Sequence, residues 1–282
     1  MAEIRVADEA GACYGVQRAL DMVREAAAAE PGAVRTLGPL IHNPTVVSDL
    51  GARGVEVVES PERAAGKTLV LRTHGVTPEV EDAARAACPQ VIDATCPFVK
   101  RAHNAAEQLT REGYQVIVVG EAGHPEVEGT VGHAPEAIVV GSAAELEGVK
   151  IARRVGVVVQ TTMRKAILQE VVDALIGQAE EVRLIDTICK ATSDRQRAAA
   201  ALAKEADVMV VIGGRNSANT TRLAEICRAA CPQTHHVEGA DELDAVWFEG
   251  ARLIGVTAGA STPQDQIEAV CARIKDQSKA DA

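Results

Sequence analysis

The stretch Val91-Ile92-Asp93-Ala94-Thr95-Cys96 ends an apolar, strand-like run with a cysteine, and helical spacing of apolar residues follows it. The same features recur at Cys189, where Ile185-Asp186-Thr187-Ile188-Cys189 repeats the frame, and at Cys13, which follows the apolar residues 4–7. A cysteine between a strand end and a helix start lies where sites form in open α/β sheets. The three junctions divide the chain into near thirds and predict three thiolates that converge on one metal centre.

Strands alternate with helices on either side of these junctions, which predicts an α/β protein with parallel sheets and right-handed crossovers. The pattern divides into three small parallel-sheet α/β modules, residues 13–95, 96–188 and 189–274. The third module lacks a final strand before a cysteine, so we expect residues 1–12 to complete its sheet. Residues 275–282 are expected to form a flexible, frayed tail.

Length and composition indicate a globular protein with reduced thiols. The chain has 282 residues, of which 47% are hydrophobic, and its longest uncharged apolar runs are too short to span a membrane. The N-terminus carries Glu3 and no apolar signal region, which predicts a cytoplasmic protein. Seven cysteines are an odd number, and they fit reduced thiols better than a disulfide framework.

The charge balance argues against one class of partner. The formal net charge is −11 and aromatic residues make up 2% of the chain, so there is no basic excess for phosphates and little for bases to stack on. We therefore expect no nucleic-acid partner, and no membrane partner. A small anionic substrate stays compatible with this charge if helix N-termini, hydroxyls and histidines meet its charge locally.

Polar side chains occupy matching loops in the three modules. One set follows the first predicted strand of each module, and a second set follows a later strand. Both sets lie at carboxyl ends of strands and ahead of helix N-termini, where backbone N–H groups bind phosphate. Together they predict a cage for a phosphorylated ligand above the metal centre. The residues are His42, His124 with Glu126, Ser217 with Asn219, His74, Thr161 and Ser261.

Seven short motifs follow one another from about residue 3 to residue 274. They are residues 11–19, 93–97, 123–129, 160–162, 188–192, 216–220 and 257–261. In this order and spacing they resemble the 4-hydroxy-3-methylbut-2-enyl diphosphate reductase family. The motif Gly123-His124-Pro125-Glu126-Val127-Glu128-Gly129, together with the three cysteines, is highly specific for that family.

The resemblance implies an iron–sulfur oxidoreductase of the methylerythritol phosphate route of isoprenoid biosynthesis. The family removes the allylic hydroxyl of (E)-4-hydroxy-3-methylbut-2-enyl diphosphate with two electrons and two protons, which forms isopentenyl diphosphate and dimethylallyl diphosphate. The implied cofactor is one [4Fe–4S] cluster per chain, with one iron not ligated by cysteine, and the modules would surround it with pseudo-threefold symmetry. The implied partners are the allylic diphosphate substrate and an external electron donor such as ferredoxin or flavodoxin.

The resemblance also implies a role for each site residue. Cys13, Cys96 and Cys189 would hold three irons, and the fourth iron would bind the substrate oxygen. Glu126 would supply the proton as a general acid. The residues that would surround the substrate and its diphosphate are His42, His74, His124, Thr161, Ser217, Asn219 and Ser261.

Two positions depart from the family pattern. Ala12 stands where the family usually has an aromatic residue, and this should change the packing beside Cys13. Ala218 stands where the family usually has a second serine, so the diphosphate site loses one hydroxyl and keeps only the backbone N–H at that position.

Two other classes of protein use part of the same pattern. A zinc hydrolase could hold its metal with three cysteines and an open water position, and it would need no external electrons. A non-catalytic iron–sulfur sensor or scaffold would need the cysteines but not the polar cage. The remaining cysteines are interpreted as small buried apolar residues and the remaining histidines as surface or capping residues. These are Cys88, Cys227, Cys231 and Cys271, and His103, His133, His235 and His236.

Overall fold

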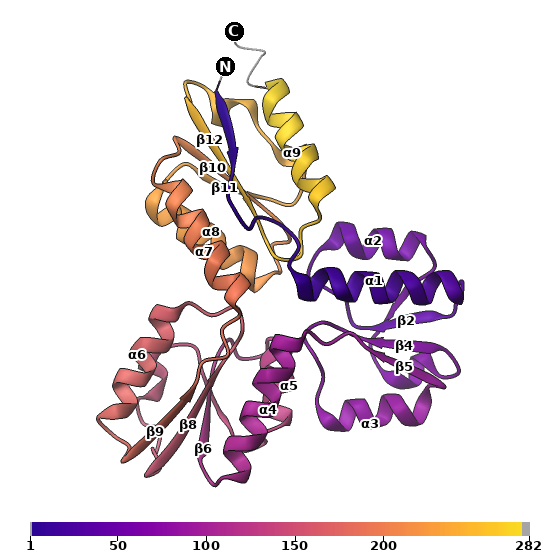
Figure 1. Ribbon diagram of the computed structural model, residues 1–282, viewed down its shortest axis with the longest axis vertical. Coiled ribbons are helices and arrows are strands. Elements are labelled where there is room, and N and C mark those ends of the chain that lie inside the picture. Colours follow the sequence, from indigo (N-terminus) through magenta and orange to yellow (C-terminus); the bar gives the residue numbers. More distant parts are fainter. Residues whose placement is uncertain (1, 278–282) are drawn as a thin grey trace. The chain divides into compact units, whose positions relative to one another are not determined.

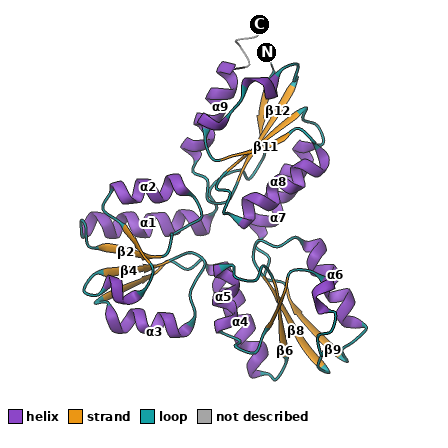
Figure 2. Ribbon diagram, turned by 180° about the vertical axis from the view of Figure 1, so that it is seen from behind, coloured by secondary structure: helices purple, strands orange, loops and turns teal. Residues whose placement is uncertain are grey.

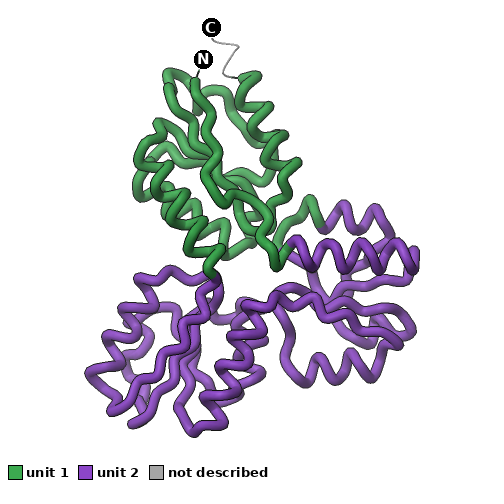
Figure 3. Tube along the Cα trace, in the orientation of Figure 1, with its two compact units in different colours: residues 1–16, 42–46, 190–282 green, residues 17–41, 47–189 purple. Residues whose placement is uncertain are grey.

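The computed structural model describes residues 2–277, in which the strands form three parallel four-stranded sheets (Figure 1). The chain divides into two compact units (Figure 3). Unit 1 combines the residues up to 16, residues 42–46 and the residues from 190 onward, whereas unit 2 comprises residues 17–41 and 47–189. The three-module architecture of parallel α/β sheets is confirmed, while the predicted module boundaries stay a prediction.

Unit 1 contains one sheet, in the order β1-β12-β10-β11. Its strands are β1 (Glu3–Val6), β10 (Val208–Ile212), β11 (Thr234–Val237) and β12 (Leu253–Ala258). β1 pairs in parallel with β12, with Ile4 beside Ile254 and Val6 beside Val256. This pairing agrees with the expectation that the N-terminal strand completes the last sheet. β11 is a strand that the sequence analysis did not predict.

Helices cover both faces of the unit 1 sheet (Figures 1 and 2). They are α7 (Lys190–Ala203) and α8 (Ala218–Ala230) on one face and α9 (Gln264–Gln277) on the other. Every residue of β10 is buried, as expected for a central parallel strand between two helical layers. The expected tail at Lys275 begins too early, because α9 continues to Gln277, whose Nε2 donates to the carbonyl oxygen of Leu243 at 3.1 Å. Residues 278–282 lie outside the described residues.

Unit 2 contains two sheets with equivalent strand orders, β3-β2-β4-β5 and β7-β6-β8-β9. The first is built from β2 (Val34–Leu37), β3 (Glu56–Val58), β4 (Thr68–Leu71) and β5 (Gln90–Asp93). The second is built from β6 (Gln115–Val119), β7 (Ile138–Val140), β8 (Arg154–Val159) and β9 (Glu181–Ile185). β3, with three residues, is the shortest strand of the first sheet and was not predicted.

The helices of unit 2 cover these two sheets. Around the first lie α1 (Tyr14–Ala29) and α2 (Pro44–Ala52), whose first residues belong to unit 1, and α3 (Pro78–Ala87). Around the second lie α4 (Pro97–Arg111) and α5 (Pro125–Gly132) on one face and α6 (Lys165–Ile176) on the other. Single 3₁₀ turns complete the described elements: η1 (Pro61–Ala64), η2 (Ala143–Leu146), η3 (Ala240–Glu242) and η4 (Ala245–Phe248). No helix among residues 2–277 has the length and apolar character needed to cross a membrane.

The three sheets share one topology, which explains the repeat seen in the sequence. β2, β6 and β10 occupy the same place in their sheets, and so do β4, β8 and β12. The fourth place is filled by β5, β9 and β1, and each of these strands leads directly to one of the three predicted cysteine ligands. The N-terminal strand thus fills the place that the third module leaves open, and Cys13 follows it as Cys96 follows β5.

Candidate active site

The backbone of each predicted cysteine ligand is fixed in the same way. Each cysteine lies between the end of a strand and the first residue of a helix, and its N–H donates to a carbonyl oxygen in the loop after the neighbouring strand. Those loops carry the predicted site residues His74, Thr161 and Ser261. The bonds run from Cys13 to Ala260 at 3.1 Å, from Cys96 to Thr73 at 3.0 Å and from Cys189 to Thr161 at 3.0 Å.

The three thiols suit an iron–sulfur cluster by their chemistry. Thiolates are the usual ligands of such clusters, and within residues 2–277 none of the cysteines is joined in a disulfide. Cys189 is buried, whereas Cys13 and Cys96 are half-buried. Cys13 belongs to unit 1 and the other two to unit 2, and the described residues form no group of three His, Cys, Asp or Glu side chains that could hold a metal ion. Ligation by all three cysteines therefore stays a prediction.

The other four cysteines are not placed at such junctions. Cys88, Cys227 and Cys231 are buried, and Cys271 is half-buried on α9. Burial raises the pKa of the Cys227 thiol to about 12, so this side chain stays protonated at neutral pH. These positions agree with the interpretation of the four as small apolar residues.

Glu126 lies in the first turn of α5, and its carboxylate is 2% exposed. Both carboxylate oxygens bond to one residue of unit 2. The N–H of Thr161 donates to Oε1 at 2.6 Å, and Oγ1 of Thr161 lies 2.8 Å from Oε2. The carbonyl oxygen of Thr161 in turn accepts the N–H of Cys189. A single threonine therefore connects the predicted proton donor to a predicted cluster ligand.

Burial raises the pKa of Glu126 to about 7, because the low dielectric disfavours the charged carboxylate more than the two bonds from Thr161 favour it. An ordinary glutamate has a pKa near 4.5. Near neutral pH this carboxyl group is therefore divided between its acid and base forms. That is the range in which a general acid works best.

His74 and His124 lie together in unit 2. Their rings meet edge to face with centroids 5.7 Å apart. Nδ1 of His124 accepts the backbone N–H of Glu126 at 3.1 Å, so Nδ1 carries no proton. Nε2 of His124 must then carry the proton, and the ring can donate it to a ligand. Gly123, which directly precedes His124, has φ +78, a left-handed conformation that lets the loop turn into α5.

Unit 1 brings together His42, Ser217, Asn219 and Ser261 on the loops after β10 and β12 and on the segment 42–46. Oγ of Ser261 donates to the carbonyl oxygen of His42 at 3.3 Å, and Nδ2 of Asn43 donates to the carbonyl oxygen of Ser261 at 2.8 Å. Ser217 caps α8, since its Oγ accepts the N–H of Thr220 at 3.4 Å. The start of α8 therefore lies among these polar groups, and the partial positive charge of a helix N-terminus favours an anion there.

Asn219, a predicted substrate-binding residue, has a buried side-chain amide at the start of α8. Its side chain is 6% exposed, and neither Oδ1 nor Nδ2 has a hydrogen-bond partner among the described residues. A buried amide without partners costs free energy in the folded protein. A bound ligand with phosphate oxygens would accept a hydrogen bond from Nδ2 and offset part of that cost.

Two histidines that the sequence analysis assigned to surfaces or caps have other positions. His236 on β11 donates from Nε2 to the carbonyl oxygen of Gly213 at 2.8 Å, at the start of the loop that carries Ser217. His103 on α4 is 5% exposed, so its assignment to the surface is wrong. Burial lowers the pKa of His103 to about 4, which leaves the ring neutral. Only the apolar spacing of α4 could have indicated that position 103 faces inward.

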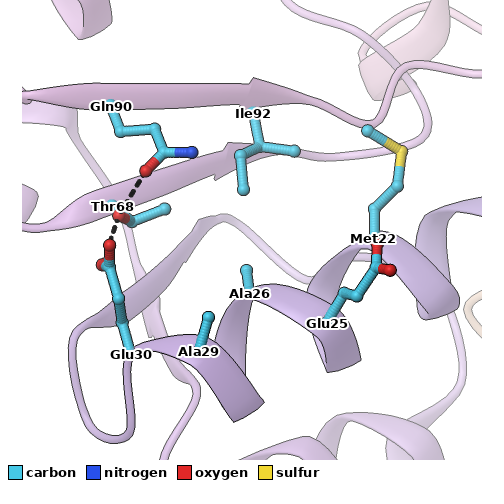
Figure 4. A pocket seen from close by; sticks show the side chains of 8 residues that line it. All are labelled: Met22, Glu25, Ala26, Ala29, Glu30, Thr68, Gln90 and Ile92. Atoms are coloured by element: carbon cyan, nitrogen blue, oxygen red, sulfur yellow. Dashed lines mark hydrogen bonds between the residues drawn. The ribbon is translucent and has the colours of Figure 1, made fainter.

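A separate cavity of about 320 Å³ lies in unit 2 between α1 and the strands β4 and β5 (Figure 4). Its lining is largely alkyl, and Oγ1 of Thr68 bonds to Glu30 at 2.8 Å along one side. None of the predicted site residues lines it. It therefore has no place in the candidate active site.

The sequence model of the LytB protein family matches residues 4–275. The chain belongs to the LytB family. The 4-hydroxy-3-methylbut-2-enyl diphosphate reductase of Geobacter sulfurreducens is 49% identical to it over 276 residues, which cover 97% of each chain. The enzyme of the same name from Aquifex aeolicus is 45% identical over 280 residues, 98% of this chain and 97% of that one. The family assignment drawn from the motifs is confirmed.

Solved structures of LytB-family reductases agree with this assignment. A structure of (E)-4-hydroxy-3-methyl-but-2-enyl diphosphate reductase is 45% identical, has a TM-score of 0.73 and matches 98% of this chain and 100% of its own. The corresponding reductase from Plasmodium falciparum is 25% identical, has a TM-score of 0.89 and matches 95% of this chain and 86% of its own. The LytB fold therefore extends over nearly the whole chain.

Proposed function

We propose that this chain catalyses the reductive dehydroxylation of (E)-4-hydroxy-3-methylbut-2-enyl diphosphate to isopentenyl diphosphate and dimethylallyl diphosphate, the last step of the methylerythritol phosphate pathway. The observation that carries this proposal is the buried Glu126, whose bonds to Thr161 connect it to Cys189. Removing a hydroxyl from carbon requires a proton for the leaving oxygen. A carboxyl group with a pKa of about 7 beside a predicted cluster ligand supplies it.

The proton is held at Oε2 of Glu126. Oε1 already accepts the backbone N–H of Thr161, so the protonated oxygen is the one that faces the Thr161 hydroxyl. A hydroxyl can accept this proton and donate its own, so Thr161 can pass a proton from Glu126 to the departing substrate oxygen. His124, whose Nε2 carries a proton, orients the same end of the substrate.

The diphosphate end of the substrate binds to donors rather than to fixed positive charges. Asn219 offers an amide that has no partner among residues 2–277, and Ser217 offers its hydroxyl proton, since its Oγ accepts from Thr220. Ser261 would turn its hydroxyl from the carbonyl oxygen of His42 to the diphosphate, and the N-terminus of α8 adds partial positive charge. His42 and His74 complete the set that surrounds the diphosphate. Local donors of this kind can bind an anionic diphosphate although the chain has a net charge of −11, because a hydrogen bond depends on the atoms in contact and not on the net charge.

Cys13, Cys96 and Cys189 would hold a [4Fe–4S] cluster by three of its irons. The bound cluster would supply the two electrons, and its fourth iron would act as a Lewis acid toward the substrate oxygen. An external donor such as ferredoxin or flavodoxin delivers the electrons, and the enzyme works in the cytoplasm.

The test starts from anaerobically purified protein. We expect a brown colour that dithionite bleaches, and turnover of the allylic diphosphate with a reduced viologen. Cys13→Ser, Cys96→Ser and Cys189→Ser should each lose the cluster or the activity, whereas Cys88→Ser serves as the buried control and should lose neither. A colourless zinc protein would support the hydrolase instead, and a coloured protein without turnover would support the sensor.

A further inference from the structure

His103 lies in the interior of unit 2, where α4, α5 and the loop after β4 meet. It is on α4, and its ring stacks on that of His133, the C-terminal cap of α5, with centroids 4.5 Å apart. Nε2 of His103 is buried and has no hydrogen-bond partner among residues 2–277. The ring is neutral, so neither charge nor a hydrogen bond of Nε2 explains its position. At its Nε2 end, the ring of His103 therefore acts by filling space.

The far end of the ring faces two glycine backbones. A Cβ atom at Gly75 would lie 2.5 Å from Cε1 of His103, and one at Gly129 would lie 3.1 Å from Nε2. The two glycines are also close to each other, since a Cβ at Gly129 would lie 3.6 Å from the carbonyl carbon of Gly75. Only glycine allows the loop and the helix to approach the ring this closely.

Each glycine belongs to a segment that carries a residue of the proposed active site. Gly75 directly follows His74, whose ring meets that of His124. Gly129 lies in α5, one turn after Glu126. A second close approach fixes the same two segments, because a Cβ at Gly132 would lie 2.5 Å from Cβ of Thr77. The ring of His103 therefore touches the backbones that set the positions of His74 and Glu126.

We propose that His103 is a positioning residue, whose ring holds the loop of His74 against the helix of Glu126 by filling the space beside Gly75 and Gly129. This inference rests on the proposed function. An error of about 1 Å in the position of a reacting group can reduce turnover about 100-fold. A ring that controls the spacing of these backbones therefore affects the reaction without touching the substrate.

The test is a pair of changes that compensate each other. His103→Ala removes the ring and should lower kcat about 10- to 100-fold, while KM changes by at most about threefold, because catalysis requires closer alignment than binding. Gly129→Ala alone should also lower kcat, because its new Cβ meets the ring. In the double variant, which carries both His103→Ala and Gly129→Ala, the new methyl group occupies space that the ring has vacated. Its kcat should therefore recover at least about fivefold over that of His103→Ala. Such non-additivity is expected for residues in contact.

A readout independent of activity accompanies the kinetics. Amide hydrogen exchange of residues 73–77 and 125–133 should speed up in His103→Ala and slow again in the double variant. If His103→Ala does not fold, His103→Gln, which keeps a planar polar group of similar length, replaces it and should show the same pattern at smaller size. His235→Ala is the matched control, since His235 also stacks on a neighbouring ring, that of Trp247, with a buried unpartnered Nε2, but lies on β11 in unit 1.

The outcomes separate this inference from the proposed function. If the parent protein lacks turnover, the proposed function fails, and the exchange data still test the packing role of the ring. If the parent is active and His103→Ala keeps kcat within twofold, or if the double variant is no better than His103→Ala, the positioning role is overturned. An equal loss in His235→Ala would also overturn it, because the effect would then be general to histidines that stack on a neighbouring ring.

Discussion

The loop after β6 and the loop after β10 occupy the same place in sheets of the same strand order, yet their polar side chains have opposite arrangements. After β6, the buried carboxylate of Glu126 is bonded at both oxygens, and Nδ1 of His124 is bonded to the Glu126 backbone. After β10, the buried amide of Asn219 has no partner at either polar atom within the described part of the chain. The carboxylate after β6 is thus satisfied by Thr161, which follows the neighbouring strand β8, whereas both amide atoms of Asn219 lack a partner among residues 2–277.

Under the proposed function, this difference is a division of roles between equivalent positions: proton transfer after β6 and anion binding after β10. A group that must hold and release a proton needs a fixed orientation and a tuned pKa, and the two bonds from Thr161 together with burial provide both for Glu126. A group that binds an anion needs an open donor, and an unpartnered Nδ2 on Asn219 provides it. The shared topology thus puts the two segments at equivalent positions, and the residues in each segment determine which chemical role it can have.

The largest effect expected from this comparison is at Glu126. Glu126→Gln keeps the size of the side chain but removes the transferable proton, so turnover should fall about 10²- to 10⁴-fold while substrate still binds. Steady-state reduction with a chemical reductant measures turnover, and substrate-induced changes in the Mössbauer spectrum measure substrate binding. Glu128→Gln is the matched control on the same helix, because Glu128 is exposed and should keep most of the activity. Near-normal turnover in Glu126→Gln would mean that the carboxylate only orients Thr161.

A second effect concerns stability and pH. The pKa of Glu126 is about 7 in the folded protein and near 4.5 when unfolded, so the folded state holds the proton more tightly. Below pH 4.5 both states are protonated, and as pH rises from 4.5 to 7 the free energy of unfolding should fall by up to about 3 kcal/mol. Glu126→Gln should not show this fall. Denaturant unfolding of both proteins across this window checks it, and parallel curves would show that the carboxylate is not desolvated.

The sequence predicted the central strands well, because buried parallel strands such as β8 are continuous apolar runs with clear ends. It placed a helix start near Glu126 but did not predict the extent of α5, whose eight residues include Pro125, Gly129 and Gly132. Those glycines lower helix propensity, but they allow the backbone to approach His103 and Thr77. Glycine is needed at these two positions because of His103 and Thr77, which are distant in the sequence, so a local pattern cannot predict it. The unpredicted β11 carries two histidines in four residues, and its pairing with β10 determines its conformation.

The candidate site was predictable in its residue types but not in its pairings. Matching loop positions indicated Glu126, Thr161 and Asn219, since sites form at the carboxyl ends of parallel strands in each sheet. Which polar atoms bond to each other depends on side-chain geometry across 35 residues in the case of Glu126 and Thr161. That contact could not be derived from spacing alone.

The next effect is at Asn219, where binding and stability should separate. Asn219→Ala removes one donor to the diphosphate, so inorganic diphosphate should inhibit turnover more weakly by about 1–3 kcal/mol in binding free energy. Because the amide atoms have no partners among residues 2–277, the free energy of unfolding should stay the same or rise. Asn216→Ala, an exposed residue of the same loop, is the control and should leave inhibition unchanged. A loss of stability in Asn219→Ala without weaker inhibition would make the amide a structural group.

The smallest effect concerns Ala218, the first residue of α8 after the cap at Ser217. The half-buried Ala218 offers only its backbone N–H, where the family pattern named in the sequence analysis has a second serine. Ala218→Ser adds a hydroxyl beside the helix N-terminus, where phosphate oxygens accept hydrogen bonds, so diphosphate should bind more tightly by about 0.5–1.5 kcal/mol. Ala230→Ser, at the exposed opposite end of the same helix, should not change binding. Inhibition constants for inorganic diphosphate compare the three proteins. Unchanged inhibition in Ala218→Ser would show that the new hydroxyl bonds to the backbone instead, and that the open donors of this loop are limited to Asn219 and its neighbours.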